Sequence, residues 1–428
     1  MPAPRGLRLS TDGVRRQAVL DRAQAVGRLP SIVVGTGRNG VLDWTGSAGD
    51  GGHPDSQYRI GSITKSFTAV LALQCRDDGL VGLDDPLAEH LPECGYPKAT
   101  LRSLLGHSSG MQAEPVGPWW ERSPGAAVEE LLIANDGSGQ VLAPGSAFHY
   151  SNLGFALLGE VVARLRGKPW AEVLLERLLD PLGLSRTTYL PGGDHAQGYS
   201  VDHFTGTLTR EPHQDTGAMA PAGQLWSTLA DLAGWVDFLA IGRPGILTGT
   251  TLAEMYPPAP FDDYGLGLRR LAYDGRTLVG HTGSMPGFLA CAFVDPETRM
   301  SVIALANATT GVAPDQLAID VLTGADAYDG ERWSASIAVP EQAAELLGLW
   351  FWGNTAHELR WTNQLLELRT LGDGALEDRF ALEPDRIRGV GGYLLGETLL
   401  VRRDDAGRVE ALECATFVFT RSPYPDGP

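Results

Sequence analysis

The pattern of apolar and polar positions predicts a large first region with strands at both ends and helices between them. Short apolar runs bounded by turn residues indicate strands, and longer apolar runs closed by glycine indicate helices. The predicted strands are residues 31–36, 41–44, 288–294 and 300–306. The predicted helices are residues 62–78, 153–166 and 228–238. Strands at both ends of one region favour an α/β or α+β domain whose sheet brings those ends together.

The helical and strand periodicity lapses between residues 325 and 340, and the chain beyond is rich in short β-like runs. These runs are residues 365–369, 397–402 and 415–420. We therefore expect a first domain over residues 1–330, a linker over 331–340 and a small antiparallel barrel or sandwich over 341–428.

Composition and charge exclude several classes of protein. The chain has 428 residues, 43% hydrophobic and 20% charged, so it can bury a sizeable core. Its net charge of −18 disfavours nucleic acid and anionic membranes as partners, because both attract basic surfaces. No apolar run reaches the roughly 18 residues of a membrane helix, and the start of the chain lacks the apolar stretch of a signal peptide. These features predict a protein of the cytoplasm.

The four cysteines predict neither a metal site nor a disulfide framework. Cys75, Cys94, Cys291 and Cys414 form no C-x-x-C pair and have no cluster of histidines near them. We expect free thiols, no metal and no organic cofactor.

Lysine is scarce in this chain. Only Lys65, Lys98 and Lys168 stand among the 34 basic residues. Arginine keeps its proton near neutral pH, whereas lysine gives up its proton when its surroundings lower its pKa. Each lysine is therefore a candidate for a role that arginine cannot fill.

The first candidate motif is Ser62-Ile-Thr-Lys65, at the start of the first apolar helix. Residues i and i+3 share one face of a helix, so Ser62 and Lys65 can touch. A serine hydroxyl needs a base to become a good nucleophile, and a lysine in a dry pocket can be that base. Backbone N–H groups at the helix start would stabilise an oxyanion beside Ser62. Taken alone, this spacing is equally typical of a helix cap beside a surface charge.

Two further motifs carry polar groups suited to acyl transfer. Tyr150 and Asn152, in Y-x-N, enter the second helix and offer a phenol that passes protons and an amide that donates and accepts hydrogen bonds. The segment Gly280-His-Thr-Gly-Ser284 is expected at the end of a strand, where Gly283 would let a substrate backbone lie close. His281 would orient or protonate the substrate. Taken alone, these motifs are also typical of an N-cap and of a surface histidine.

The order S-x-x-K, Y-x-N, H-T-G resembles that of the penicillin-binding protein and class C β-lactamase superfamily of serine acyl enzymes. The resemblance covers about residues 15–325. Further segments that resemble the family are residues 58–65, 83–87, 104–110 and 221–227. The resemblance implies an α/β domain, with an antiparallel sheet flanked by helices and a helical subdomain. The tail would then be a small all-β, lipocalin-like domain.

The resemblance also implies roles for the first two motifs. Ser62 would be the nucleophile and Lys65 its base. Tyr150 would relay a proton to the leaving group, and Asn152 would hold the substrate amide.

In the third motif, His281 takes the place of the family's lysine and is a catalytic candidate. The N–H groups of Ser62 and Ser284 would form the oxyanion hole, and Thr282 and Gly283 would contact the substrate.

The histidine of the third motif and the β-rich tail change the expected activity. A lysine there helps to hold the carboxylate of penicillins and of D-Ala-D-Ala termini, whereas H-T-G is more typical of esterases, D-aminopeptidases and amidases of the family. The plan of the whole chain resembles the penicillin-binding-protein-type thioesterases of nonribosomal peptide pathways, which are cytoplasmic and carry a lipocalin-like domain.

We therefore expect a serine acyltransferase that takes a peptidyl thioester from a carrier protein and closes it head to tail. The substrate would end in a D-residue. The alternative is a cytoplasmic esterase or a D-specific aminopeptidase or amidase. A binding protein that has lost catalysis is a third hypothesis, which the intact Ser62, Lys65 and Tyr150 argue against.

Three residues outside the motifs are also candidates. Arg421 would reach from the tail into the cleft and hold a substrate carbonyl or terminus, with an interdomain or surface role as its alternative. Trp226 would line the pocket, with a packed core position as its alternative. His107 is expected to be structural.

Overall fold

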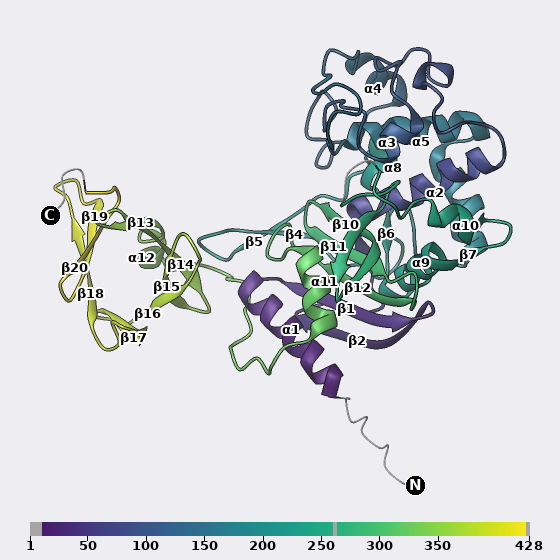
Figure 1. The fold of residues 1–428 in the computed structure, drawn as a ribbon. Coiled ribbons are helices and arrows are strands. Elements are labelled where there is room, and N and C mark those ends of the chain that lie inside the picture. Colours follow the sequence, from purple (N-terminus) through teal and green to yellow (C-terminus); the bar gives the residue numbers. More distant parts are fainter. Residues whose placement is uncertain (1–10, 260–262, 425–428) are drawn as a thin grey trace, which may run out of the picture. The chain divides into compact units, whose positions relative to one another are not determined.

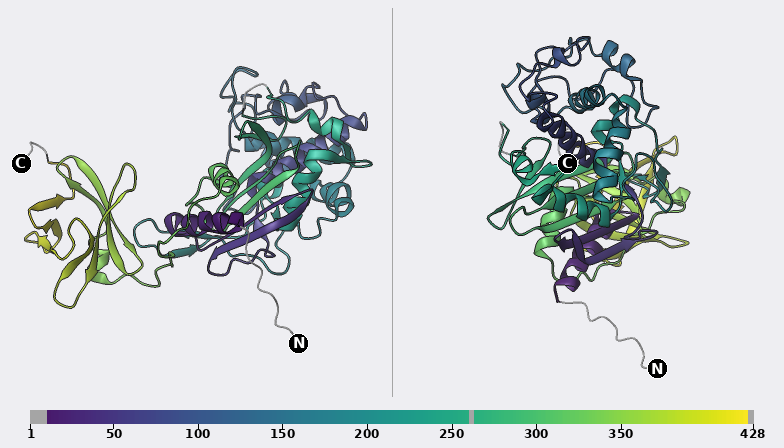
Figure 2. Two further views of the ribbon diagram at one scale, coloured as in Figure 1. Left: turned by 60° about the horizontal axis from the view of Figure 1, so that its bottom comes forward. Right: turned by 90° about the vertical axis from the view of Figure 1, so that its right-hand side faces the viewer.

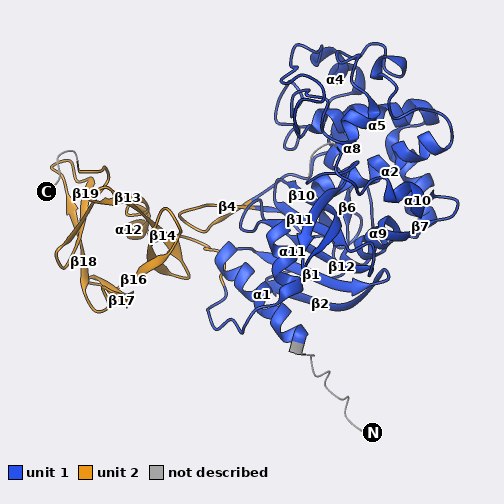
Figure 3. Ribbon diagram, in the orientation of Figure 1, with its two compact units in different colours: residues 1–199, 210–332 blue, residues 200–209, 333–428 orange. Residues whose placement is uncertain are grey.

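The computed structural model describes residues 11–259 and 263–424, and the chain divides into two compact units (Figures 1 and 3). Unit 1 comprises Met1–Tyr199 and Arg210–Arg332. Unit 2 comprises Ser200–Thr209 and Trp333–Pro428. No helix among the described residues is both long and apolar enough to cross a membrane.

Unit 1 is built on a six-stranded antiparallel sheet with the order β2-β1-β12-β11-β10-β9. The two ends of the unit meet where β1 pairs with β12, in a register that sets Ile32 opposite Ala306. This closure is what the positions of the predicted strands require. The strands are β1 (Ser31–Arg38), β2 (Val41–Gly49), β9 (Arg269–Tyr273), β10 (Arg276–Met285), β11 (Phe288–Val294) and β12 (Met300–Ala306).

Helices cover both faces of this sheet, so β11 is buried along its whole length. On one face α1 (Thr11–Gly27) and α11 (Pro314–Thr323) pack on each other and on the strands, and α9 (Leu229–Ile241) packs on the other face (Figures 1 and 2). The helix α9 begins where predicted, because the Thr228 hydroxyl accepts a hydrogen bond from the backbone N–H of Asp231.

The helical part of unit 1 is centred on α2 (Thr64–Asp77) and α5 (Asn152–Arg166), which pack on each other and on the short α8 (Ala220–Gly223). Every residue of α2 from Thr64 to Cys75 is buried, so α2 is a core helix and not an amphipathic surface helix. The other helices of unit 1 are α3 (Leu101–Leu105), α4 (Val128–Ala134), α6 (Trp170–Leu174), α7 (Asp180–Leu182) and α10 (Gly249–Ala253).

Short elements connect these helices to the sheet. The single turns are η1 (Gly61–Ile63), η2 (Leu87–Glu89), the π-helical η3 (Leu175–Leu179) and η4 (Gly217–Met219). The two-stranded ribbons are β3 (Tyr58–Arg59) with β6 (Trp226–Ser227), β4 (Tyr199–Val201) with β5 (Leu208–Arg210), and β7 (Gly242–Arg243) with β8 (Leu247–Thr248).

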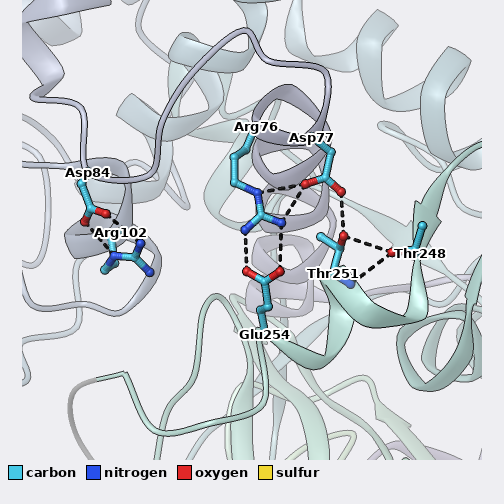
Figure 4. Close-up of polar contacts among 7 residues, drawn as sticks. All are labelled: Arg76, Asp77, Asp84, Arg102, Thr248, Thr251 and Glu254. Carbon is cyan, nitrogen blue, oxygen red and sulfur yellow. Dashed lines mark hydrogen bonds and ion pairs between the residues drawn. The ribbon is translucent and has the colours of Figure 1, made fainter.

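A polar network fixes the C-terminal end of α2 (Figure 4). Arg76 donates to Asp77 and to Glu254, with its Nη1 2.5 Å from Glu254 Oε2. The Thr251 hydroxyl donates to Asp77 Oδ2 over 2.7 Å, and Thr248 caps the helix α10 that carries Thr251. α2 is therefore anchored to α10 at one end, while its other end enters the candidate site.

Unit 2 is a closed barrel of eight antiparallel strands, with β20 pairing back to β13. The strands are β13 (Gly348–Trp352), β14 (Thr355–Thr362), β15 (Leu365–Thr370), β16 (Leu376–Leu382), β17 (Ile387–Gly392), β18 (Thr398–Arg403), β19 (Val409–Cys414) and β20 (Phe417–Thr420). The short α12 (Glu341–Ala344) precedes them, and Trp350, Leu359 and Phe380 lie in the buried core. The expected fold, a β-lactamase-like α/β domain followed by a small all-β barrel, is confirmed.

One segment of unit 2 is distant from the rest of it in the sequence. Between β4 and β5, the carbonyl of Phe204 accepts from Trp361 N over 2.7 Å, and that of Gly206 accepts from Ser336 N over 3.0 Å. From the sequence, residues 200–209 are predicted to belong to the first domain, whereas the structure groups them with unit 2. A short inserted ribbon does not change the pattern of hydrophobic positions from which domains are predicted.

The stack of Phe67 on Trp235 joins α2 to α9, with ring centroids 3.7 Å apart and both side chains fully buried. Phe67→Ala would leave a cavity there, so we expect the free energy of unfolding of unit 1 to fall by about 3–5 kcal/mol. Ile133→Ala, at a side chain that is 81% exposed, is the control and should change it by less than about 0.5 kcal/mol. Thermal unfolding followed by circular dichroism compares the two, and equal melting temperatures would contradict this packing.

Candidate active site

Ser62 lies where the chain turns into α2. Gly61 has a φ of +51°, a left-handed conformation that glycine adopts without strain, and it begins the turn η1 that leads directly into the helix. Ser62 is half-buried and belongs to the wall of a pocket of about 360 Å³. The lining residues are Ser62, Glu114, Glu121, Tyr150, Asn152, Arg269, His281, Thr282, Gly283, Ser284, Leu289 and Pro314.

Lys65 is completely buried behind Ser62, and its Nζ contacts three oxygens. Nζ lies 3.0 Å from Ser62 Oγ, 2.6 Å from Asn152 Oδ1 and 2.7 Å from the carbonyl oxygen of Ala222. Burial lowers the pKa of Lys65 to about 7, and the carboxylates of Glu114 and Glu121 oppose that shift. The amine therefore has a large neutral fraction near neutral pH.

The three contacts fix what a neutral amine of Lys65 can do. The amide oxygen of Asn152 and the carbonyl of Ala222 can only accept hydrogen bonds, so they take its two N–H groups. The lone pair is then left toward Ser62, whose hydroxyl can donate to it. This arrangement is that of a base directed at a serine hydroxyl.

Asn152 is held in one orientation from its other side. Its Nδ2 donates to Glu114 Oε1 over 2.6 Å, and Glu114 Oε2 accepts from the indole N–H of Trp120 over 2.7 Å. Ser151 caps α5 by accepting from the backbone N–H of Gly154. The amide oxygen of Asn152 therefore faces Lys65, and the amide nitrogen faces Glu114.

Tyr150 completes the polar wall around Ser62. Lys65 Nζ lies 4.9 Å from the centre of the Tyr150 ring, and the ring packs on His107 with centroids 4.1 Å apart. Burial raises the pKa of Tyr150 above its ordinary value, against a smaller opposing effect of its hydrogen bond with Ser62. The phenol thus stays protonated at neutral pH.

His281 differs from its expected placement and surroundings. It lies inside β10 and not at a strand end, because β10 continues to Met285. Its Nδ1 lies 2.5 Å from the Thr282 carbonyl oxygen, and its Nε2 lies 2.9 Å from the Tyr264 hydroxyl. Burial lowers the pKa of His281 well below its ordinary value. Since a carbonyl only accepts, Nδ1 carries the proton of a neutral ring, and Nε2 accepts from Tyr264.

Two glycines let the backbone of β10 approach that of Ser62. A Cβ on Gly283 would lie 1.9 Å from the carbonyl oxygen of Ile60 and 3.4 Å from Ser62 N, and a Cβ on Gly61 would lie 2.7 Å from Ser284 N. Any side chain at either glycine would push the two segments apart. The N–H groups of Ser62 and Ser284 therefore belong to neighbouring backbone segments.

Four polar residues of the site carry no signal in the sequence analysis. Glu114, Glu121 and Tyr264 lie in loops without a recognisable motif, and Arg269 begins β9. Arg269 lies opposite Gly280 in the sheet, and its Nη1 is 3.2 Å from Thr282 Oγ1. Only the three-dimensional fold brings Glu114, Glu121 and Arg269 to the pocket of Ser62 and Tyr264 to His281.

Two further candidates, Trp226 and Arg421, have their described contacts within their own units. Trp226 is 1% exposed and packs on His213 and Phe288, so it takes its alternative place in the core. Arg421 belongs to unit 2, where its guanidinium donates to the carbonyls of residues 345, 347 and 349 and lies 3.8 Å from the centre of the Trp350 ring. We therefore place Trp226 in the core of unit 1, whereas a contact of Arg421 with a bound substrate stays a prediction.

His107 is buried and supports the Y-x-N motif. Its Nδ1 accepts from the backbone N–H of Ser151 over 3.1 Å. Burial, together with the positive charge of Lys65, keeps the pKa of His107 well below its ordinary value. The neutral ring therefore serves to hold the segment that carries Tyr150 and Asn152.

One group of side chains among the described residues has the spacing of a metal site. Ligand atoms of Asp85, Glu89 and His90 lie within 4.8 Å of one another. Asp85 already accepts from the backbone N–H of Gly82, and none of the three lines the pocket of Ser62. We assign no metal to this trio.

A family model described as Beta-lactamase matches residues 17–325. The chain belongs to the Beta-lactamase family. A second model, the domain of unknown function DUF7586, matches residues 339–421 and thus covers the barrel strands. The sequence expectation of a β-lactamase-like serine enzyme is confirmed at this level.

Two individual relatives share about a quarter to a third of the aligned residues with this chain. A D-aminopeptidase of Brucella anthropi is 24% identical over 355 residues, which make up 79% of this chain and 64% of the relative. Beta-lactamase-like protein 2 of Dictyostelium discoideum is 30% identical over 48% of this chain and 39% of its own length. The chain therefore spans less than two thirds of the length of these two proteins.

Two solved structures match this chain over different shares of its length. A D-stereospecific amidohydrolase from Streptomyces sp. is 28% identical, with a TM-score of 0.63, and the match covers 72% of this chain and 97% of that protein. SurE is 23% identical, with a TM-score of 0.60, and the match covers 96% of this chain and all of SurE. The second match shows a shared fold over nearly the whole chain.

Proposed function

We propose that Ser62 attacks the carbonyl carbon of an acyl donor while the neutral amine of Lys65 takes the Ser62 proton. The observation that carries this proposal is the set of contacts at Lys65 Nζ, in which two oxygens that only accept leave the lone pair for the Ser62 hydroxyl. Burial supports it by keeping much of Lys65 uncharged near neutral pH. The product of this step is a tetrahedral intermediate bound to Ser62 Oγ.

The N–H groups of Ser62 and Ser284 would hold the negative oxygen of that intermediate. The support is the close approach of β10 to η1 at Gly61 and Gly283. Tyr150 would then pass the proton from Lys65 to the leaving group as the C–N, C–O or C–S bond breaks. Its raised pKa suits this relay, because the phenol gives its own proton to the leaving group and receives one from Lys65.

The resulting acyl-enzyme would be released by the reverse sequence. Water or an amine attacks the ester of Ser62, its proton passes to Lys65 by way of Tyr150, and Ser62 regains its hydrogen. Water gives a hydrolase, and an amine on the same acyl chain gives a cyclic amide.

For the acyl donor we propose a D-configured residue bound as an amide, ester or thioester, with hydrolysis as the first candidate outcome. The support is the likeness to the D-stereospecific amidohydrolase and to the D-aminopeptidase. The H-T-G motif of residues 281–283 agrees with this class. From the sequence alone, the cyclase is the first candidate. These two relatives favour hydrolysis as the first candidate instead.

Head-to-tail closure of a peptidyl thioester is the second candidate outcome. It is supported by Glu114 and Glu121, two carboxyl groups in the pocket wall that would attract the N-terminal ammonium of the bound peptide itself. Both candidates share the acyl-enzyme at Ser62 and differ only in the second nucleophile. A carrier protein as donor of the thioester belongs to this second candidate.

Mass spectrometry of one reaction separates these candidates. We would incubate the protein with a linear peptide that ends in a D-residue activated as an N-acetylcysteamine thioester, and with its L-epimer. We expect thiol release to be roughly 10- to 100-fold faster from the D-epimer, because the proposed substrate class has the D-configuration at the reacting residue. A product that has gained water identifies a hydrolase, and a product without water identifies a cyclase.

Ser62→Ala should abolish thiol release, whereas the matched control Ser185→Ala, at an exposed serine, should leave it unchanged. Thiol release by Ser62→Ala at the rate of the unmodified protein would contradict the proposal. Equal rates for the two epimers would contradict the D-configured substrate class alone.

The pH dependence of acylation tests the role of Lys65. The rate should rise with pH as Lys65 loses its proton, with a midpoint near its pKa of about 7. Glu121 raises the pKa of Lys65, because a nearby negative charge favours the ammonium form. In Glu121→Gln the midpoint should therefore move to lower pH, whereas Glu129→Gln, an exposed control on α4, should not move it.

Stopped-flow acylation by p-nitrophenyl butyrate across the neutral range measures this midpoint. The neutral ester makes no direct use of Glu121, so the profile reports the base and not substrate binding. A midpoint that stays in place or moves to higher pH in Glu121→Gln would contradict the assignment of Lys65 as the base.

A further inference from the structure

The barrel of unit 2 contains a pocket of about 340 Å³. Three aromatic residues at strand ends contribute to its wall: Trp352 ends β13, Tyr393 directly follows β17, and Phe417 begins β20. Buried residues Leu368 and Phe419 also line it. The pocket therefore has an apolar interior and an aromatic rim.

The rim exposes two large aromatic side chains to solvent. Trp352 is 48% exposed and Tyr393 is 84% exposed. The ring of Phe417 packs on both, with its centroid 5.3 Å from that of Trp352 and 5.9 Å from that of Tyr393. A contiguous exposed group of large apolar side chains marks a binding surface more often than single exposed residues do.

The position of Tyr393 is built into the barrel. Asp378 Oδ1 accepts from the backbone N–H of Leu394 over 2.6 Å, which ties the loop to β16. Gly392 has a φ of +90°, and a Cβ there would lie 2.0 Å from the carbonyl oxygen of Glu377. The chain thus turns tightly against β16 directly before Tyr393, and the exposed ring sits on an anchored loop.

The charge of the pocket complements a cation. Glu377 and Asp378 contribute two carboxyl groups to the wall, and neither lysine nor arginine occurs among the described residues that line it. His357 Nε2 lies 3.0 Å from Glu377 Oε2, so a protonated His357 would offset one of the two negative charges at most. The aromatic rim therefore lies beside a net negative charge.

We propose that this pocket binds an organic cation, the guanidinium or ammonium group of a peptide side chain of the arginine or lysine type. The faces of Trp352, Tyr393 and Phe417 carry the negative part of the ring quadrupole and attract such a cation, and the carboxyl groups of Glu377 and Asp378 add direct attraction. The alkyl stem of either side chain would cover the apolar interior. This binding role does not depend on the acyl transfer proposed for unit 1.

Calorimetric titration of the full chain tests this site, with Nα-acetylarginine amide, Nα-acetyllysine amide and Nα-acetylcitrulline amide as probes. Citrulline has the shape of arginine without its charge. At low ionic strength we expect arginine or lysine to bind roughly tenfold more tightly than citrulline. Trp352→Ala, Tyr393→Ala and Glu377→Gln should each weaken that binding roughly fivefold, whereas Leu400→Ala, at a 58% exposed residue of β18 outside the pocket, should not.

The variants distinguish loss of binding from loss of folding. Tyr393 is so exposed that its removal leaves the barrel core intact, so loss of folding cannot imitate loss of binding in that variant. Unchanged cation binding in Glu121→Gln, which removes a carboxyl group from the pocket of Ser62, separates this site from the acyl-enzyme site. Equal affinity for citrulline, no measurable binding of either cation, or full affinity in both Trp352→Ala and Tyr393→Ala would overturn the proposal.

Discussion

The amine of Lys65 is completely buried and contacts three oxygens. These oxygens belong to three helical segments: Ser62 lies before α2, Asn152 begins α5, and Ala222 lies in α8. An ammonium group is costly to bury, so the surroundings favour the neutral amine that a base requires. The close packing of α2, α5 and α8 keeps water away from that nitrogen. The hydrophobic core of the helical part is in this sense a component of the site, because a looser core would restore the ordinary pKa of Lys65 and remove the base.

The other side of the site depends on backbone and not on charge. Gly61 and Gly283 let η1 and β10 approach until their N–H groups can serve one oxyanion. His281 is neutral and has both ring nitrogens hydrogen-bonded, so it forms part of the wall without offering a charge. The fixed positive charge near Thr282 is instead that of Arg269. The wall of the Ser62 pocket therefore contains two carboxyl groups, of Glu114 and Glu121, and the guanidinium of Arg269.

The sequence predicts those parts of the fold and site that depend on residues close together along the chain. The strands β11 and β12 lie exactly at the predicted residues 288–294 and 300–306, and α5 ends at Gly167 because that glycine adopts a left-handed φ. The helix α1 is not predicted, since its polar and apolar residues show little segregation. Glu114, Glu121 and Arg269 are also missed, because loop closure and strand pairing bring them to the pocket of Ser62 and no local spacing records either event. The same holds for the ribbon of residues 200–209, whose partners are more than a hundred positions away.

The proposed chemistry requires a neutral Lys65 near neutral pH, and the small number of lysines makes its protonation state directly measurable. In protein labelled with [ε-¹³C]lysine, the ε-carbon signals of Lys65, Lys98 and Lys168 can be followed through a pH titration by nuclear magnetic resonance. We predict that one lysine ε-carbon signal titrates near pH 7 and that this signal disappears in Lys65→Met. If the signal lost in Lys65→Met instead titrates near the usual lysine value of about 10.4, Lys65 is an ammonium group at neutral pH and cannot be the base for Ser62.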